Sequence, residues 1–410
     1  MAAAASTAPP PDPALSRPRL CVVAAIGMAQ ILAWGSSYYL PAVLAAPETR
    51  ATGWGGTWII GALSLGLLVS GLVSPQVGHL IERFGGRPVL AASALLLAAG
   101  LVVQALALNL LMFVLAWLVL GLGMGAGLYD PAFATLGRLY GDEARGAITQ
   151  VTLFAGFSST LCWPLSAFLV ETVGWRGASL GYAAINIAVV LPLYLLGVPR
   201  EARRPAPAGH AVGTAAQGER GRPGDRPAFL ILAAGLTVAS VIMTVVSVHL
   251  LTLLQARGLA LAAAVGLGAL MGPSQVGARA LEALFGRKFH PIWSLVVSTV
   301  LVAVGLAMML GPARAIGAGV VLYGAGGGIR SIARGTVPLA MFGREGYAIL
   351  MGWLAMPSLL AQAASPSVGV VLIERLGPSL TLAVLCATAV LNIGLVLCLV
   401  PFALRRPMVA

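Results

Sequence analysis

Long apolar runs recur along this whole chain, and they most constrain how it can fold. Each run has about twenty residues, which is the length that an α-helix needs to cross the roughly 30 Å apolar core of a bilayer. Only 9% of the residues are charged, against about 25% in soluble domains. The pattern predicts an all-α membrane protein with about twelve transmembrane helices. The predicted spans are residues 20–45, 57–80, 88–109, 111–138, 147–171, 177–197, 228–254, 260–284, 292–310, 315–341, 348–373 and 379–404.

The second half of the chain echoes the first. The segment Gly127-Leu-Tyr-Asp-Pro-Ala-Phe-Ala-Thr135 corresponds to Gly328-Ile-Arg-Ser-Ile-Ala-Arg-Gly-Thr336, and Phe168–Gly174 corresponds to Val371–Gly377. Both echoes have an offset of roughly two hundred residues. Many secondary transporters build a central binding site from such paired halves. The repeat therefore predicts two pseudo-symmetric six-helix bundles and makes transport the leading function.

A polar stretch separates the two halves. Residues 199–227 are rich in Pro, Gly, Ala and Arg and show no apolar period, so we predict a flexible cytoplasmic linker. The apolar run that follows residues 1–19 is too long for a signal peptide, so these residues are predicted to form a disordered cytoplasmic tail. The predicted bundles are residues 20–198 and 228–404, and residues 405–410 form a second cytoplasmic tail.

The basic residues indicate the orientation. The net charge of +12 is concentrated in alternate loops rather than in one patch, which argues against nucleic-acid binding. By the positive-inside rule both termini lie in the cytoplasm, and the Ala-, Gly- and Arg-rich composition favours a bacterial inner membrane. The basic loops and tails hold Arg17, Arg19, Arg83, Arg87, Arg138, Arg145, Arg200, Arg203, Arg204, Arg220, Arg222, Arg226, Arg287, Lys288, Arg344, Arg405 and Arg406. The opposite loops hold Arg50, Arg176, Arg257, Arg314 and Arg375.

A loop motif lies between the second and third spans. It reads Gly78-His-Leu80-Ile-Glu82-Arg83-Phe-Gly85-Gly86-Arg87-Pro88. This resembles the cytoplasmic signature Gly-x-Leu-x-Asp-Arg-x-Gly-Arg-Lys of the major facilitator superfamily, with Glu82 in the place of Asp. A tight turn between two helices requires glycine. The resemblance implies an alternating-access transporter in which Glu82 caps the start of the eleventh span in the outward-open state.

A few ionisable residues fall well inside the predicted spans, where charges are costly and usually face a cavity. They are Asp130, His249, Arg279, Arg330 and Arg334, on the fourth, seventh, eighth and tenth spans. In the resembled superfamily, the first, fourth, seventh and tenth spans line the central cavity and the eighth lies beside them. We therefore expect these side chains at a substrate site.

Arg279 has a further resemblance. Its place in the eighth span is similar to that of the arginine which binds the substrate carboxylate in monocarboxylate transporters and oxalate/formate antiporters. A guanidinium suits this task because its donors form a bidentate fork. Those transporters often carry an Asp one turn earlier, where this chain has Gln275. The alternative is that Arg279 and Glu282 belong to a second, degenerate copy of the loop motif.

Arg330 and Arg334 lie one helical turn apart, so they share one face. The repeat places Asp130 at a similar depth in the other half. An ion pair between Asp130 and one of these arginines would form a gate or a charge-compensated site, and Asp130 is the predicted proton-coupling residue. The alternative is that the arginines extend to the headgroups.

Three further residues complete the predicted substrate site: Tyr38 on the first span, Trp163 on the fifth and His249 on the seventh. For each, helix packing is the alternative. The glycine-rich segments at residues 123–127 and 324–328 lie inside apolar spans, so they predict close helix packing rather than nucleotide binding. We expect no cofactor, no metal site and no catalytic constellation.

The predicted function is secondary transport of a small organic anion such as a monocarboxylate, because the charged cavity candidates sum to three Arg against one Asp. Protons or a counter-anion would drive it, and the protein would be a monomer. One alternative is efflux of a drug, a metabolite or an arsenical. The other, of a different class, is a non-transporting membrane sensor with this fold.

Overall fold

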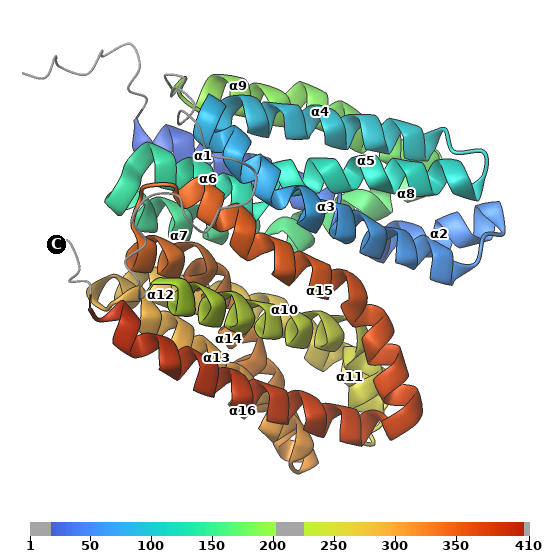
Figure 1. Ribbon diagram of the computed structural model, residues 1–410. Helices are drawn as coiled ribbons and strands as arrows, with labels where there is room; N and C mark the ends of the chain where they lie inside the picture. Colours follow the sequence, from blue (N-terminus) through green and yellow to red (C-terminus); the bar gives the residue numbers. More distant parts are fainter. Residues whose placement is uncertain (1–17, 202–224, 406–410) are drawn as a thin grey trace, which may run out of the picture.

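The computed structural model describes residues 18–201 and 225–405, and these form helices joined by short turns (Figure 1). No β-strand occurs within those two ranges. The all-α membrane fold predicted from the apolar runs is therefore confirmed. Most of the predicted N-terminal tail and linker, and residues 406–410 of the predicted C-terminal tail, lie outside the described residues.

The first half of the chain forms one bundle (Figure 1). Its elements are α1 (Arg19–Gly35), α2 (Pro41–Thr52), α3 (Gly56–Phe84), α4 (Gly86–Ala105), α5 (Leu110–Gly127), α6 (Tyr129–Tyr140), the 3₁₀ turn η2 (Gly141–Glu143), α7 (Ala144–Ala155), α8 (Ser158–Ile185), the π-helical turn η3 (Asn186–Val190) and α9 (Leu191–Gly197).

The second half forms the other bundle (Figure 1). Its elements are α10 (Asp225–Gln255), α11 (Leu261–Ala269), α12 (Met271–Phe285), the 3₁₀ turn η4 (Gly286–Lys288), α13 (Pro291–Leu310), α14 (Ala313–Phe342), α15 (Tyr347–Leu376) and α16 (Pro378–Ala403).

Every predicted span coincides with a helix or a helix pair. Nine helical runs in the described part of the chain are long and apolar enough to cross a membrane. One of these runs, Leu110–Gly197, contains three predicted spans, with the chain reversing at Gly174 (φ 73°). The first predicted span corresponds to the shorter apolar helix α1 followed by α2.

Several spans are broken, which the apolar pattern did not predict. The first span turns over residues 36–40 and continues as α2 to Thr52, seven residues beyond its predicted end at residue 45. Pro41 begins α2, where its missing N–H removes no helical hydrogen bond. The fourth span breaks at Leu128, whose extended backbone separates α5 from α6. Broken membrane helices often line substrate sites.

The glycine-rich segments pack closely in both halves, as predicted. A Cβ atom on Gly125 would lie 3.0 Å from the Ser70 carbonyl oxygen of α3. One on Gly326 would lie 2.7 Å from the Ser298 carbonyl oxygen of α13. Glycine therefore lets these helix backbones approach to a distance that any side chain would prevent.

The two bundles meet mainly where α3 crosses α15, and where α6 and α7 approach α12, α14 and α15. A buried apolar cluster joins them there, with Ile81 and Phe133 of one bundle and Tyr347 and Met351 of the other. The helix α2 packs chiefly on α3 and α8, and α11 on α10, α12 and α14, each within its own bundle. The bundles are thus joined at the side where α1 begins and α16 ends, which we call the terminal side.

Candidate functional site

An ion pair joins the two bundles between α6 and α14. The Nε of Arg334 donates to Asp130 Oδ1 at 2.8 Å, and its Nη2 donates to Oδ2 at 2.6 Å. Each side chain is only 14% exposed. Asp130 lies in the first turn of α6, where the helix dipole favours a negative charge. The structure thus selects Arg334 from the two arginines that the sequence offered as partners.

A cavity adjoins this ion pair and is lined by both bundles. It holds about 440 Å³ of empty space, part of it open to the surroundings. The lining residues are Trp34, Tyr38, Leu67, Ser70, Ser74, Met124, Gly125, Leu128, Tyr129, Asp130, Pro131, Arg334, Leu359 and Gln362. The breaks in the first and fourth spans therefore both border the cavity.

Aromatic rings cluster where the first span breaks. Trp34 contacts Tyr38 edge-on at a centroid distance of 5.3 Å and lies 4.9 Å from Tyr129. Tyr39 continues the cluster to Trp163 of α8, at 6.3 Å. Trp163 is 46% exposed, so a large part of its ring remains open to contact. The predicted residues Tyr38 and Trp163 thus belong to one aromatic cluster beside the cavity.

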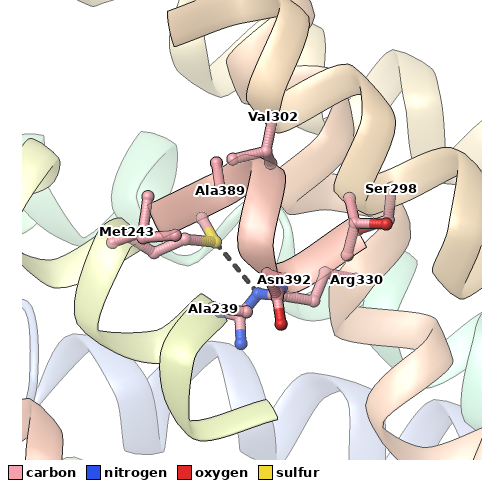
Figure 2. Close-up of a pocket in the computed structure, with 9 residues that line it drawn as sticks. Ala239, Met243, Ser298, Val302, Arg330, Ala389 and Asn392 are labelled. Carbon is pink, nitrogen blue, oxygen red and sulfur yellow. Dashed lines mark hydrogen bonds between the residues drawn. The ribbon is translucent and has the colours of Figure 1, made fainter. Parts of the chain in front are cut away.

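Arg330 lies one turn before Arg334 on α14 but points toward α10 (Figure 2). Its Nε donates to Met243 Sδ at 3.0 Å, and its Nη1 donates to Ser240 Oγ at 3.3 Å. Tyr38 and Tyr323 lie within electrostatic range. Within the described ranges, no carboxylate forms an ion pair with Arg330. Its hydrogen-bond partners are therefore neutral, and the carboxylate of Asp130 acts on it only at longer range.

Arg279 of α12 reaches across to the other bundle. Its Nη1 donates to the Thr152 carbonyl oxygen of α7 at 3.1 Å, and its Nη2 donates to Gln275 Oε1 at 3.4 Å. The residue is 6% exposed, and its buried Nε has no hydrogen-bond partner among the described residues. Tyr39 and Tyr129 lie within electrostatic range. Arg279 is thus a second cation with neutral partners near the aromatic cluster.

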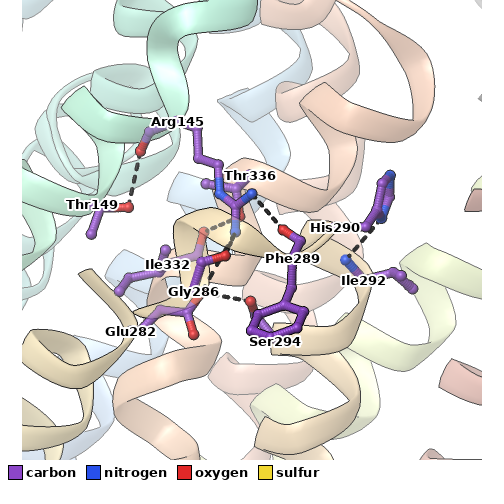
Figure 3. A network of polar contacts seen from close by, with 10 residues as sticks. All are labelled: Arg145, Thr149, Glu282, Gly286, Phe289, His290, Ile292, Ser294, Ile332 and Thr336. Atoms are coloured by element: carbon purple, nitrogen blue, oxygen red, sulfur yellow. Dashed lines mark hydrogen bonds and ion pairs between the residues drawn. The ribbon is translucent and has the colours of Figure 1, made fainter. Parts of the chain in front are cut away.

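Glu282, which the sequence suggested as a companion of Arg279, takes part in a different contact (Figure 3). Arg145, at the start of α7, lies 3.8 Å from Glu282 Oε1 and donates to the carbonyl oxygens of Gly286 and Phe289 at 2.5 and 2.7 Å. Ser294 donates to Glu282 at 2.5 Å. This network ties the first bundle to the α12–α13 turn on the terminal side.

The loop motif forms the tight turn that its glycines predict. Gly85 has φ 84°, in the left-handed region that favours glycine, and its N–H donates to the Ile81 carbonyl oxygen at 2.9 Å. Gly78 lies at the crossing of α3 and α15, because a Cβ there would be 2.5 Å from the Ala348 carbonyl oxygen. Leu80 is 44% exposed, and Arg87 lies in the first turn of α4.

Glu82 of the motif pairs with an arginine of the first bundle. Glu82 Oε1 lies 3.4 Å from Nη1 of Arg138, and Arg138 also forms an ion pair with Glu201. Glu201 Oε1 accepts a hydrogen bond from the Gly86 N–H at 3.2 Å. Arg83 stacks on the ring of Phe84 at 5.0 Å. The capping of α15 by Glu82 stays a prediction.

His249 lies apart from these contacts. Its Nε2 is 3.1 Å from the Pro366 carbonyl oxygen, and its ring fills the space beside Gly369 on α15. It does not line the cavity at the Asp130–Arg334 pair. This placement matches the packing alternative, and its substrate role stays a prediction.

Two further polar residues were missed in the sequence. Glu48 on α2 and Gln104 at the end of α4 are each 1% exposed and hydrogen-bonded to one another. The first predicted span stopped three residues before Glu48, so this acid was read as a loop residue. The sequence did contain a signal for a buried acid, because Glu48 directly follows an apolar run that can continue as a helix.

Comparisons with known proteins agree with this architecture. The family model of the Major Facilitator Superfamily matches residues 23–310. Monocarboxylate transporter 11 of Mus musculus is 36% identical over 147 residues, which are 33% of this chain and 32% of that protein. The chain thus matches about a third of the length of this curated relative.

Solved structures extend the likeness to nearly the whole chain. The human organic anion transporter MFSD10 (TETRAN) superposes with a TM-score of 0.75 at 16% identity, covering 93% of this chain and 100% of that one. The transporter FucP in the outward conformation superposes with a TM-score of 0.67 at 14% identity, covering 92% and 99%. With a family match over more than half of its residues and twelve spans in two bundles, this chain belongs to the Major Facilitator Superfamily of transporters.

Proposed function

We propose that this transporter moves a small organic anion, such as a monocarboxylate, across the membrane by alternating access. The observation that carries the proposal is Arg330, a guanidinium inside the membrane with only a thioether and a hydroxyl as hydrogen-bond partners. Because charge in a membrane is costly unless it is compensated, a substrate carboxylate is the natural partner for this cation. Arg279, with neutral partners of its own, adds a second positive charge.

The aromatic cluster complements the cations. Trp34, Tyr38 and Trp163 offer flat apolar surfaces with polar edges, which suit the organic part of a small anion. Monocarboxylate transporter 11 and the organic anion transporter MFSD10 are named for substrates of this class, which supports the proposal. A cavity of aromatics alone would favour the efflux alternative, but Arg334 lines this cavity, and Arg330 and Arg279 lie within electrostatic range of the aromatic cluster.

Asp130 is the proposed proton-coupling residue. When Asp130 is ionised, its two carboxylate oxygens accept hydrogen bonds from Nε and Nη2 of Arg334. Protonation would remove its charge and free Arg334 to bind the substrate carboxylate, so one proton and one anion would move together. In the alternative of anion exchange, the incoming anion displaces Asp130 without a proton.

The terminal side is the proposed cytoplasmic side, since the basic loops lie there. The bundles are joined on that side through Arg145, Arg279 and the α3–α15 crossing. The arrangement is therefore interpreted as an outward-facing state of a monomer in a bacterial inner membrane. Its likeness to FucP in the outward conformation supports this interpretation.

Flux in proteoliposomes tests the proposal. A panel of labelled anions is offered under an imposed pH gradient to the wild type, Arg330→Gln and Arg330→Lys. We expect a carboxylate to move in the wild type and Arg330→Gln to lose at least about tenfold in uptake, which corresponds to 1.4 kcal/mol. Lys keeps the positive charge but lacks the bidentate geometry of the guanidinium. The uptake by Arg330→Lys is therefore expected to lie between those of the wild type and Arg330→Gln. Arg314→Gln, at an exposed arginine of the same helix, is the matched control.

The same assay separates the alternatives. Movement of a cationic or neutral compound, with no anion transported, would replace the proposal by efflux. An anion that binds in detergent but shows no flux would indicate a sensor.

A further inference from the structure

The outer part of the first span contains a buried acid that is hydrogen-bonded to a buried amide, and that amide's oxygen has no partner among the described residues. Glu48 on α2 and Gln104 at the end of α4 are each 1% exposed. Gln104 donates from Nε2 to Glu48 Oε1 at 2.7 Å. The Oε1 of Gln104 is also buried and accepts no hydrogen bond in the part of the chain that the structure describes. A buried polar atom without a partner requires an explanation.

Among the residues that the structure describes, no cation pairs with Glu48. Arg50 of α2 itself is exposed, and Arg176 of α8 donates to the Ala107 carbonyl oxygen and stacks on Trp175. Glu171 of α8 is exposed, while the charged residues and histidine of α3 and α4 lie at their far ends. The titratable groups of α8 form hydrogen bonds elsewhere. Cys162 Sγ donates to the Ile31 carbonyl oxygen. The Tyr182 hydroxyl is hydrogen-bonded to Ser166. No ion pair to Glu48 occurs among the described residues.

We propose that Glu48 and Gln104 form a proton-binding site. With a proton on its second oxygen, the Glu48 carboxyl donates to Gln104 Oε1 while Gln104 Nε2 donates to Glu48 Oε1. The two groups then form a closed acid–amide ring that satisfies both buried acceptors. When Glu48 releases this proton to water, the bond from Gln104 Nε2 to Glu48 Oε1 remains, but the second bond is lost and the carboxylate faces the lone pairs of Gln104 Oε1, so the ring opens on that side.

The site controls α2. This short helix begins at Pro41, directly after Tyr38 and Tyr39 of the aromatic cluster, and the Glu48–Gln104 bond ties it to α4. Ring opening therefore weakens the tie between α2 and α4, next to the aromatic cluster and on the side opposite the terminal side. The site lies outside the substrate contacts of Arg330 and Asp130, and the proton bound here is not the one carried with the substrate.

Infrared spectroscopy of the full-length protein in liposomes tests the proton directly. We expect a protonated-carboxyl C=O band that titrates between about pH 5 and about pH 9 and that is absent from Glu48→Gln. The control is Glu171→Gln, which removes an exposed acid of α8 and leaves the band unchanged. A wild-type spectrum without a band that depends on Glu48 at any pH in this range overturns the proposal.

Hydrogen exchange tests the consequence for α2. After correction for the intrinsic pH dependence, we expect amides of residues 41–52 to exchange roughly tenfold faster in wild type at high pH than at low pH. Glu48→Gln can form an amide–amide ring with Gln104, so it should fold and stay protected at both pH values. Equal pH dependence in both proteins overturns the coupling to α2. Neither measurement uses a substrate, so the result is separate from the organic-anion proposal.

Discussion

Asp130 and Arg334 are 204 positions apart in the chain, yet they form two hydrogen bonds, of 2.8 and 2.6 Å, between the two bundles. The pair lies at a cavity lined by both bundles. The pair is one of several contacts between the bundles, and its ionic part requires the charge of Asp130. In the proposed function this contact would also be the place where protonation of Asp130 frees Arg334 for the substrate carboxylate.

Replacing Asp130 by Asn is expected to impair transport and to lower stability. The change leaves the Arg334 guanidinium without a charged partner, and breaking one side of a buried ion pair costs about 3–5 kcal/mol. Thermal unfolding and proton-driven flux measure the two effects. Arg334→Gln and the double variant complete a mutant cycle that isolates the pair energy. Flux with unchanged pH dependence in Asp130→Asn would rule out its coupling role.

Replacing Gly78 by Ala is expected to force α3 and α15 apart. The new Cβ would lie 2.5 Å from the Ala348 carbonyl oxygen, and backbone cannot yield as a flexible side chain does. Overpacking of this kind costs about 1–3 kcal/mol. Distances between spin labels on the terminal side should shift toward the separated state. Gly61→Ala in the same helix meets no atom within 4 Å and should leave the distances unchanged.

Replacing Glu282 by Gln is expected to weaken the closure of the terminal side. The charge opposite Arg145 is lost, although Ser294 can still donate to the amide oxygen. An ion pair at this separation contributes about 1 kcal/mol or less. Accessibility of an engineered cysteine on the terminal side should rise accordingly. Glu171→Gln, at an exposed acid of α8, is the control, and equal accessibility in both variants would show that the pair does not hold the bundles closed.

Acid is expected to weaken the α12–α13 turn through His290. Burial, and then the positive charge of Arg145, lower the pKa of His290 below its ordinary value of 6.5. Below pH 6.5 the unfolded chain therefore binds more protons than the folded chain. The stability that neutral His290 contributes is present above pH 6.5 and is lost as the pH falls below that value. His290 Nδ1 also accepts from the Ile292 N–H at 3.2 Å, a bond that protonation removes.

The His290→Asn variant tests this expectation, because Asn can cap α13 but does not titrate. Unfolding midpoints should fall less in the variant than in the wild type between about pH 7.5 and about pH 5.5. A midpoint that falls equally in both proteins would assign the acid sensitivity to other groups.

The sequence by itself determined the all-α membrane fold, the twelve spans and the family. Apolar length and repeat offset are properties of the chain in one dimension, and a bilayer leaves an apolar run of this length few other structures. The turn at Gly85 and the close approaches at Gly125 and Gly326 were also readable, because glycine marks a local backbone requirement.

The tertiary structure alone decided which charges meet. Arg330 and Arg334 share one helix face in the sequence, but only Arg334 reaches Asp130, while Arg330 turns to Met243 and Ser240 of α10. Glu48 became a buried acid only because the first span breaks before Pro41 and continues as α2 against α4. Hydropathy measures whether a residue tolerates apolar surroundings, whereas pairing depends on which side chains two separate bundles bring within hydrogen-bond distance.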